Sequence, residues 1–225
     1  MNGKTITFKT NGHTCEGYFS IPDTGGGPGI IVLQEWWGLV GHIKDLADRF
    51  AIAGFAALAP DIYHGDSTTH PDDAGRLMMA LNIDQTQKDL NGAVNFLLDH
   101  VAVSSDAIGT VGFCMGGQLS LFAACANPSI GACVDFYGIH PNVQLDMKNL
   151  RAPVLGIFAE NDEFVTMETA KGLESKLKEH GKETDFTYYP EVGHAFFNDS
   201  REDVYNEEAA SDAWQKVITF FDSNL

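Results

Sequence analysis

Two kinds of hydrophobic pattern alternate along the chain. Residues 29–33 and 56–59 are continuous apolar runs, which are typical of strands buried on both faces of a sheet. Residues 42–53 lie between them and instead carry apolar side chains at the i, i+3, i+4, i+7 spacing of an amphipathic helix. A strand followed by a helix is the unit that recurs to the end of the chain.

The same criteria divide the rest of the sequence into strands and helices. Asn11-Gly12 predicts a tight turn between the first two strands, and Gly181 is the residue expected just past a helix end. The expected strands are 5–8, 14–19, 29–33, 56–59, 108–113, 132–137, 154–159 and 184–189; the expected helices are 42–53, 73–81, 85–100, 117–126, 169–180 and 206–222. This alternation predicts a single α/β domain over residues 1–225, with a mostly parallel sheet covered on both faces and function at the carboxyl ends of its strands.

Composition and charge exclude several classes of function. The chain has 14 basic and 31 acidic residues, for a net charge of −17. This argues against nucleic-acid binding, which depends on clustered Lys and Arg. No apolar run approaches the roughly 20 residues of a membrane helix, and the first residues lack the apolar core of a signal peptide. We therefore expect a cytoplasmic protein that binds neither nucleic acid nor membrane.

Four cysteines are spread along the chain without a Cys-x-x-Cys pair: Cys15, Cys114, Cys125 and Cys133. This spacing fits neither a disulfide framework nor a sulfur-rich zinc site. Reduced cysteines are expected, and one of them stands in an unusual sequence context.

The segment Gly112-Phe113-Cys114-Met115-Gly116-Gly117 lies where a predicted strand turns directly into a helix. A nucleophile on such a sharp turn needs glycines two residues to either side, and the start of the helix favours a thiolate. The backbone N–H of Met115 is then a natural oxyanion donor. The alternative is a buried cysteine in a glycine-rich turn. A nucleotide-binding turn is not favoured, because the sequence has neither Gly-x-Gly-x-x-Gly nor Gly-Lys-Ser/Thr.

Partners for a nucleophile follow in the order that α/β-hydrolases use, with the acid before the histidine. Asp162 comes after the strand 154–159, and His194 comes after the strand that ends at residue 189. Asp162 could also be a turn or helix-capping aspartate, with Glu160 and Glu163 as competitors for the acid. Any single histidine is more often structural or exposed than catalytic. The spacing therefore supports His194 more strongly than Asp162.

Neither a metal nor an organic cofactor is expected from the sequence. His64 and His70 share a loop, but no third ligand accompanies them there.

Several blocks resemble the dienelactone hydrolase family of α/β-hydrolases. They are Gln34-Glu35-Trp36-Trp37-Gly38, Ala59-Pro60-Asp61-Ile62-Tyr63, the cysteine elbow at 112–117 and Gly193-His194-Ala195-Phe196. The blocks run in family order from about residue 15 to 220. Cysteine in place of serine at the elbow makes the match specific.

The resemblance implies a Cys114–Asp162–His194 triad that cleaves a lactone or carboxylic ester through an acyl-cysteine, as a carboxymethylenebutenolidase does. It also implies that Glu35 lies beside the thiol and helps to control its ionisation. The backbone N–H groups of Trp36 and Met115 would form the oxyanion hole. The expected partner is a small ester or lactone, acted on by a monomer or small homo-oligomer.

One feature departs from the family pattern. Members that act on carboxylated dienelactones are expected to hold the carboxylate with arginines, one of them shortly after the histidine, where this chain has Asn198. Arg76 or Arg201 could replace them only if the fold brings either near the site. Candidates for substrate binding are Trp37, Arg76, Phe196 and Asn198, with core or rim packing equally open for Trp37.

Three alternatives stay open at the level of sequence. A broad carboxylesterase or thioesterase would use the same residues on other substrates. An inactive binding protein could keep the fold without the chemistry. A redox protein would need Cys125 or Cys133 to resolve an oxidised Cys114.

Overall fold

Eight strands pair into one sheet in the computed structural model, which describes residues 3–225. Their order across the sheet is β1-β2-β4-β3-β5-β6-β7-β8. The strands are β1 Lys4–Lys9, β2 Thr14–Ser20, β3 Gly29–Leu33, β4 Ala56–Pro60, β5 Ile108–Phe113, β6 Ile130–Phe136, β7 Val154–Ala159 and β8 Thr184–Tyr189. From β4 to β8 all neighbours are parallel, whereas β2 pairs antiparallel with both β1 and β4. The arrangement confirms the predicted α/β fold class.

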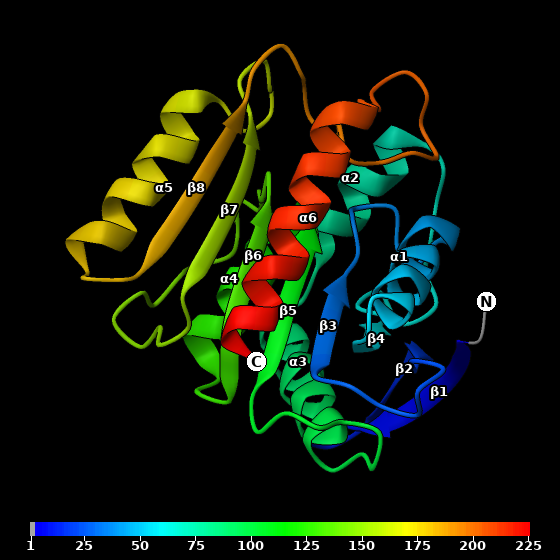
Figure 1. Ribbon diagram of the computed structural model, residues 1–225. Helices are drawn as coiled ribbons and strands as arrows, with labels where there is room; N and C mark the ends of the chain where they lie inside the picture. The colour runs from blue at the N-terminus through cyan, green and yellow to red at the C-terminus, as the bar shows by residue number, and fades with distance from the viewer. Residues whose placement is uncertain (1–2) are drawn as a thin grey trace.

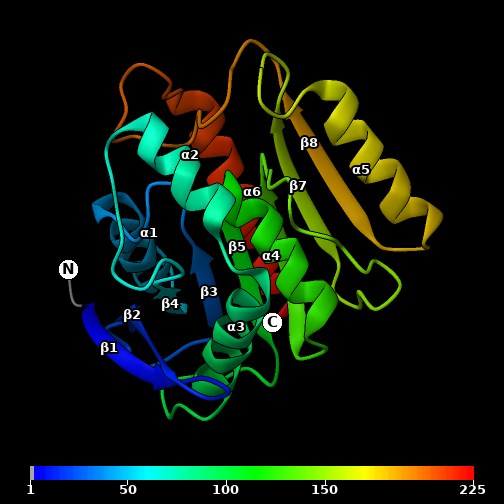
Figure 2. The ribbon, with the colours of Figure 1, turned by 180° about the vertical axis from the view of Figure 1, so that it is seen from behind.

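Helices cover both faces of this sheet. In the described part of the chain they are α1 Gly41–Ile52, α2 Pro71–Ala80, α3 Ile83–Leu98, α4 Met115–Ala126, α5 Met167–Glu179 and α6 Glu207–Asn224. Helices α1 and α6 lie in front of the sheet in Figure 1, while α3 and α4 lie on the opposite face, which Figure 2 turns toward the viewer. Helix α5 packs against β7 and β8 at one edge. The parallel strands point to one common end, where α2 and the longer loops gather.

Local sequence signals account for most element boundaries. Gly12 has φ +102° in the β1–β2 turn, and Gly181 has φ +68° just after α5, as both glycines predict. The side chain of Thr166 caps α5 by accepting a hydrogen bond from the N–H of Thr169 at 3.3 Å. Every residue of β3, β4, β5 and β7 is buried, as their continuous apolar runs indicate.

Many predicted boundaries differ from the structure by one or two residues, and two of these differences lie at the carboxyl end of the sheet. The helix predicted at 117–126 begins at Met115, because the two glycines that suggest a loop fit inside its tightly packed first turn. The strand predicted at 132–137 ends at Phe136, and Tyr137 leaves the sheet with φ +40°. Both differences reflect the sharp turns that the chain makes there.

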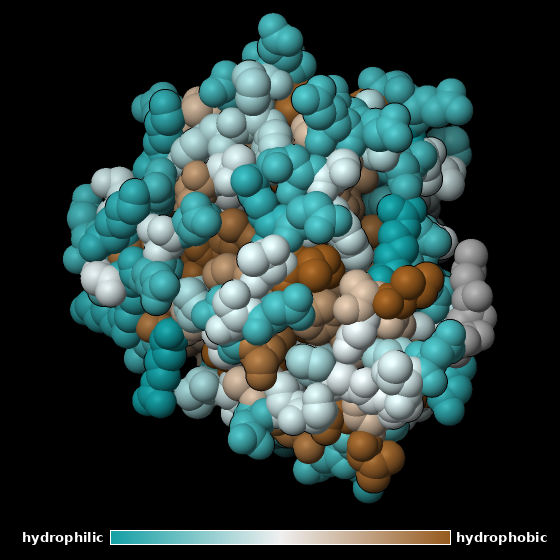
Figure 3. All heavy atoms as spheres, viewed as in Figure 1, coloured by the Kyte–Doolittle hydropathy of each residue, from teal (hydrophilic) through white to brown (hydrophobic). Residues whose placement is uncertain are grey.

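The face of the molecule that Figure 3 shows is mainly hydrophilic. Figure 3 shows apolar side chains in patches across the middle of one face, with hydrophilic groups around them. Among residues 3–225, no helix combines the length and hydropathy needed to cross a membrane.

Candidate active site

Cys114 occupies a strained turn between β5 and α4. Its backbone has φ +54° and ψ −121°, and its side chain is 7% exposed. A Cβ on Gly112 would lie 1.9 Å from the carbonyl oxygen of Gly116, so the turn closes only when residue 112 is glycine. The hydrogen bond from the N–H of Cys114 to the carbonyl of Phe136 (3.0 Å) fixes the turn against β6. This is the geometry that presents a nucleophile at the start of a helix.

His194 and Asp162 meet at the same end of the sheet, in the loops after β8 and β7. Nδ1 of His194 lies 2.7 Å from Oδ2 of Asp162, whose carboxylate is fully buried. The other carboxylate oxygen accepts the N–H groups of Phe164 and Val165 at 2.7 and 2.8 Å. Asp162 therefore organises its own loop and orients the imidazole as well.

The competing acids at this loop do not share that environment. Glu160 and Glu163 are both exposed, whereas Asp162 is 5% exposed. The position of Asp162 thus combines burial with a direct contact to the histidine.

Two acidic neighbours, Asp162 and Cys114, affect the pKa of His194. Burial lowers this pKa, but hydrogen bonds to Asp162 and to Cys114, together with the charges of these two groups, raise it to about 10. An imidazolium at this position is therefore strongly stabilised. The structure brings the thiol, the imidazole and the carboxylate together in the order that the sequence suggests.

Glu35 lies buried next to this group, directly after the β3 strand and Gln34. One of its carboxylate oxygens, Oε2, accepts a hydrogen bond from Nδ2 of Asn198 at 2.9 Å. Burial raises the pKa of Glu35 to about 6, although the charges of His194 and Arg201 and the Asn198 hydrogen bond oppose that rise. The Glu35 carboxylate is thus close enough to interact electrostatically with the imidazole of His194, and it is hydrogen-bonded directly to Asn198.

The loop after β3 lies directly beside the elbow. A Cβ on Gly116 would come within 2.5 Å of the carbonyl oxygen of Leu33, so the two segments touch through their backbones. Met115 is the first residue of α4, and its N–H has no partner within the helix. Trp36 follows in the same loop; it is half-buried and makes a T-shaped contact with Trp37 at 5.0 Å.

The remaining candidates for substrate binding have other surroundings. Arg76 is exposed and pairs with Asp73 in the same helix. Arg201, which pairs with Asp203 at 2.7 Å, is the arginine whose charge acts on Glu35. Phe196 is fully buried. Of the two arginines considered, the fold brings Arg201 toward the site.

Three aromatic residues near the site were not candidates in the sequence analysis, although Tyr63 ends one of the blocks that carry the family resemblance. Tyr137 is fully buried with its ring 4.9 Å from that of His194, and its pKa is raised well above the ordinary value by burial and by the charge of Glu35. The Tyr63 hydroxyl lies 3.2 Å from the sulfur of Met115. Phe164 packs 5.1 Å from His194 while remaining exposed. Positions at strand ends are the signal that could have found Tyr137 and Tyr63.

Comparison with known proteins adds to this geometry. The model of the dienelactone hydrolase family matches residues 15–225. Protein usf of Aquifex pyrophilus is 39% identical over 230 residues, with 99% of each chain covered. A protein of Aquifex aeolicus, provisionally named a carboxymethylenebutenolidase, is 34% identical over 230 residues, again with 99% of each chain covered. A solved structure from Klebsiella pneumoniae, provisionally named a dienelactone hydrolase, has a TM-score of 0.88 and 28% identity, covering 97% of each chain.

Proposed function

The chain belongs to the dienelactone hydrolase family, and from this membership we propose that it hydrolyses a lactone or carboxylic ester through an acyl-cysteine intermediate. The observation that carries the proposal is the strained turn at Cys114 with an imidazole beside it that Asp162 orients from 2.7 Å. Nucleophile, base and orienting acid are the three groups that acyl transfer requires.

The first half of the reaction forms the thioester. The sulfur of Cys114 attacks the carbonyl carbon, and the thiol proton passes to His194. The negative charge that develops on the carbonyl oxygen is stabilised by the N–H groups of Met115 and Trp36. When the carbon–oxygen bond of the ester breaks, His194 gives its proton to the departing alkoxide.

Water completes the cycle. His194 removes a proton from a water molecule as the water oxygen attacks the thioester carbonyl carbon. The carbon–sulfur bond then breaks, and His194 returns the proton to the cysteine sulfur. A free carboxylic acid is released. Asp162 stabilises the imidazolium in both halves without itself taking a proton.

Glu35 influences the proton transfers of His194 through its charge. With a pKa of about 6 it is mostly ionised at neutral pH, and its negative charge favours the imidazolium of His194. Asn198 is a positioning residue, because its amide holds the Glu35 carboxylate rather than facing substrate.

The substrate class follows from what surrounds the thiol. The Aquifex aeolicus relative is named for a lactone that carries a carboxylate, and Arg201 is the cation near the site that could hold such a group. A broad carboxylesterase acting on neutral esters is the second candidate. The observation that favours it is that Arg76 is exposed and pairs with Asp73, so Arg76 does not bind a substrate carboxylate at the site.

Hydrolysis of dienelactone and of p-nitrophenyl acetate, measured side by side, tests the proposal. The wild type should turn over at least one of them and Cys114→Ala neither. The control Cys125→Ala, which alters another buried thiol, should match the wild type on both. Intact-mass spectrometry should detect an acyl adduct that Cys114→Ala lacks. Equal rates in the wild type and Cys114→Ala would refute the cysteine mechanism, and turnover of the neutral ester alone would favour the esterase.

A further inference from the structure

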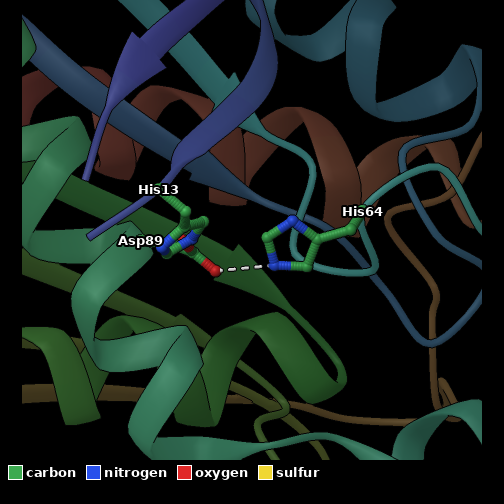
Figure 4. Close-up of side chains that lie close together, drawn as sticks. All are labelled: His13, His64 and Asp89. Carbon is green, nitrogen blue, oxygen red and sulfur yellow. Dashed lines mark hydrogen bonds and ion pairs between the residues drawn. The ribbon is translucent and has the colours of Figure 1, made fainter. Parts of the chain in front are cut away.

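A second group of reactive side chains lies outside the candidate active site. His13 comes from the turn between β1 and β2, His64 from the loop after β4, and Asp89 from α3. Their ligand atoms all lie within 4.8 Å of one another. Figure 4 shows the imidazole of His64 pointing at the Asp89 carboxylate, with the His13 side chain overlapping Asp89 in this view.

The carboxylate is the buried centre of this cluster. Asp89 is fully buried, whereas the side chains of His13 and His64 are 30% and 39% exposed. Nε2 of His13 lies 2.7 Å from Oδ1, and Nε2 of His64 lies 2.9 Å from Oδ2. Two accessible imidazoles therefore face one buried anion, which gives a cation both a set of ligands and a path from solvent.

The donor set selects the kind of cation. Two imidazole nitrogens and one carboxylate oxygen suit Zn²⁺ and its first-row neighbours, whereas Mg²⁺ and Ca²⁺ prefer oxygen ligands alone. Tetrahedral Zn²⁺ with bonds of about 2.0–2.1 Å needs ligand atoms roughly 3.3 Å apart. The two nitrogen–oxygen distances, now 2.7 and 2.9 Å, would open by about 0.5 Å to reach that value.

Outer groups already contact the ring of His13. Oγ1 of Thr10 lies 2.7 Å from Nδ1 and 3.0 Å from Nε2 of His13, and the Gln85 side-chain nitrogen contacts both ring nitrogens, so a metal on Nε2 would displace the Gln85 amide and leave Nδ1–H to the Thr10 oxygen. The amide of Gln85 contacts both His13 and Asp89, the latter at 3.2 Å. Binding requires both Nε2 atoms without a proton, so tautomer exchange or proton release would accompany it.

The backbone around His64 is shaped to present its ring. His64 has φ +54° although it is not a glycine, and the loop is held by Asp61, which accepts the N–H of Gly65 at 2.7 Å. The neighbouring Tyr63 reaches the sulfur of Met115 at the elbow. A cation at this cluster would thus fasten the N-terminal hairpin and α3 to the loop that supports the elbow.

From this geometry we infer that His13, His64 and Asp89 form a binding site for one Zn²⁺ per chain, with the remaining coordination open to water. The site acts as a clamp between three segments that are distant in sequence. It does not depend on the proposed hydrolase reaction.

Zinc titration of metal-free, tag-free protein tests the inference, with calorimetry and thermal unfolding as readouts. The Cys114→Ala background is used throughout, because a thiol next to an imidazole can itself bind zinc. One equivalent of Zn²⁺ should bind and raise Tm by about 5–10 °C at a hundredfold excess over Kd. Co²⁺ should develop a visible ligand-field absorption on the same residues.

Matched variants separate this site from surface binding. His64→Ala and Asp89→Asn should each weaken binding by at least about 10–100-fold, the loss that outer-shell changes alone produce. His70→Ala, which removes an exposed histidine from the same loop, should bind as the background protein does. Absence of saturable binding, equal binding by His64→Ala, or an equal Tm rise with Mg²⁺ would overturn the inference.

Discussion

The ionisation of Glu35 should place a pH-dependent cost on the folded protein. A rise in pKa from the ordinary 4.5 to about 6 on folding corresponds to about 2 kcal/mol, since one pKa unit is worth 1.36 kcal/mol. The folded state holds the proton more tightly than the unfolded state does. Stability is therefore unaffected below pH 4.5, falls as the pH rises toward 6, and stays reduced above it.

The substitution Glu35→Gln removes this cost while keeping an oxygen that can accept the Asn198 hydrogen bond. Its stability relative to wild type, from urea unfolding at a series of pH values, should increase by about 1.5–2 kcal/mol between pH 4.5 and 7.5. Glu160→Gln is the matched control, because that carboxylate is exposed just after β7, another parallel strand of the sheet. Its difference from wild type should stay within about 0.5 kcal/mol at every pH. A pH-independent difference for Glu35→Gln would refute the reasoning.

Three further predictions concern the elbow and its surroundings. Asp162→Asn should lower kcat by about 10³–10⁴-fold because the imidazole loses its orienting anion; a loss below tenfold in steady-state assays would contradict this. Gly116→Ala should destabilise by about 1–3 kcal/mol, since its Cβ meets carbonyl oxygens at 2.5 Å, whereas Gly172→Ala, in an open stretch of α5, should stabilise by about 0.5–1 kcal/mol in the same unfolding assay. Arg201→Ala should raise the pKa of Glu35, which the pH profile of kcat/KM would show. The same variant should raise the KM for an anionic lactone by up to about fivefold and leave the KM for a neutral ester unchanged.

The parts of the fold that sequence can predict are those set by neighbours along the chain. Continuous apolar runs identify the buried strands, and the glycines at 112 and 116 identify the turn at Cys114, because each requirement lies within a few residues. The order of strands is different: β4 lies between β2 and β3, which depends on packing across the sheet. No local pattern encodes that order.

The candidate site divides in the same way. Asp162 and His194 could be selected because each follows a strand at its carboxyl end. The hydrogen bond from Asn198 to Glu35 could not be predicted, since the two residues are separated by 163 positions in the sequence. His64 was paired in sequence with His70, but the structure pairs it with residues at positions 13 and 89. Contacts between distant segments are visible only after folding.

Buried carboxylates connect these observations, because each must be compensated within the fold of an acidic chain. Asp162 has two backbone N–H donors and an imidazole, and Asp89 has two imidazoles and the Gln85 amide. Glu35 has one amide, and its pKa rises to about 6.

Asp135 is the fourth case and lies under the elbow. Burial raises its pKa to about 7, so near neutral pH the group is divided between its protonated and ionised forms. A Cβ on Gly117 would meet Oδ1 of Asp135 at 2.3 Å, which shows how closely the carboxyl packs against the first turn of α4. The degree of compensation thus differs between these carboxyls: Asp162 accepts two backbone N–H groups and contacts an imidazole, whereas burial raises the pKa of Asp135 to about 7.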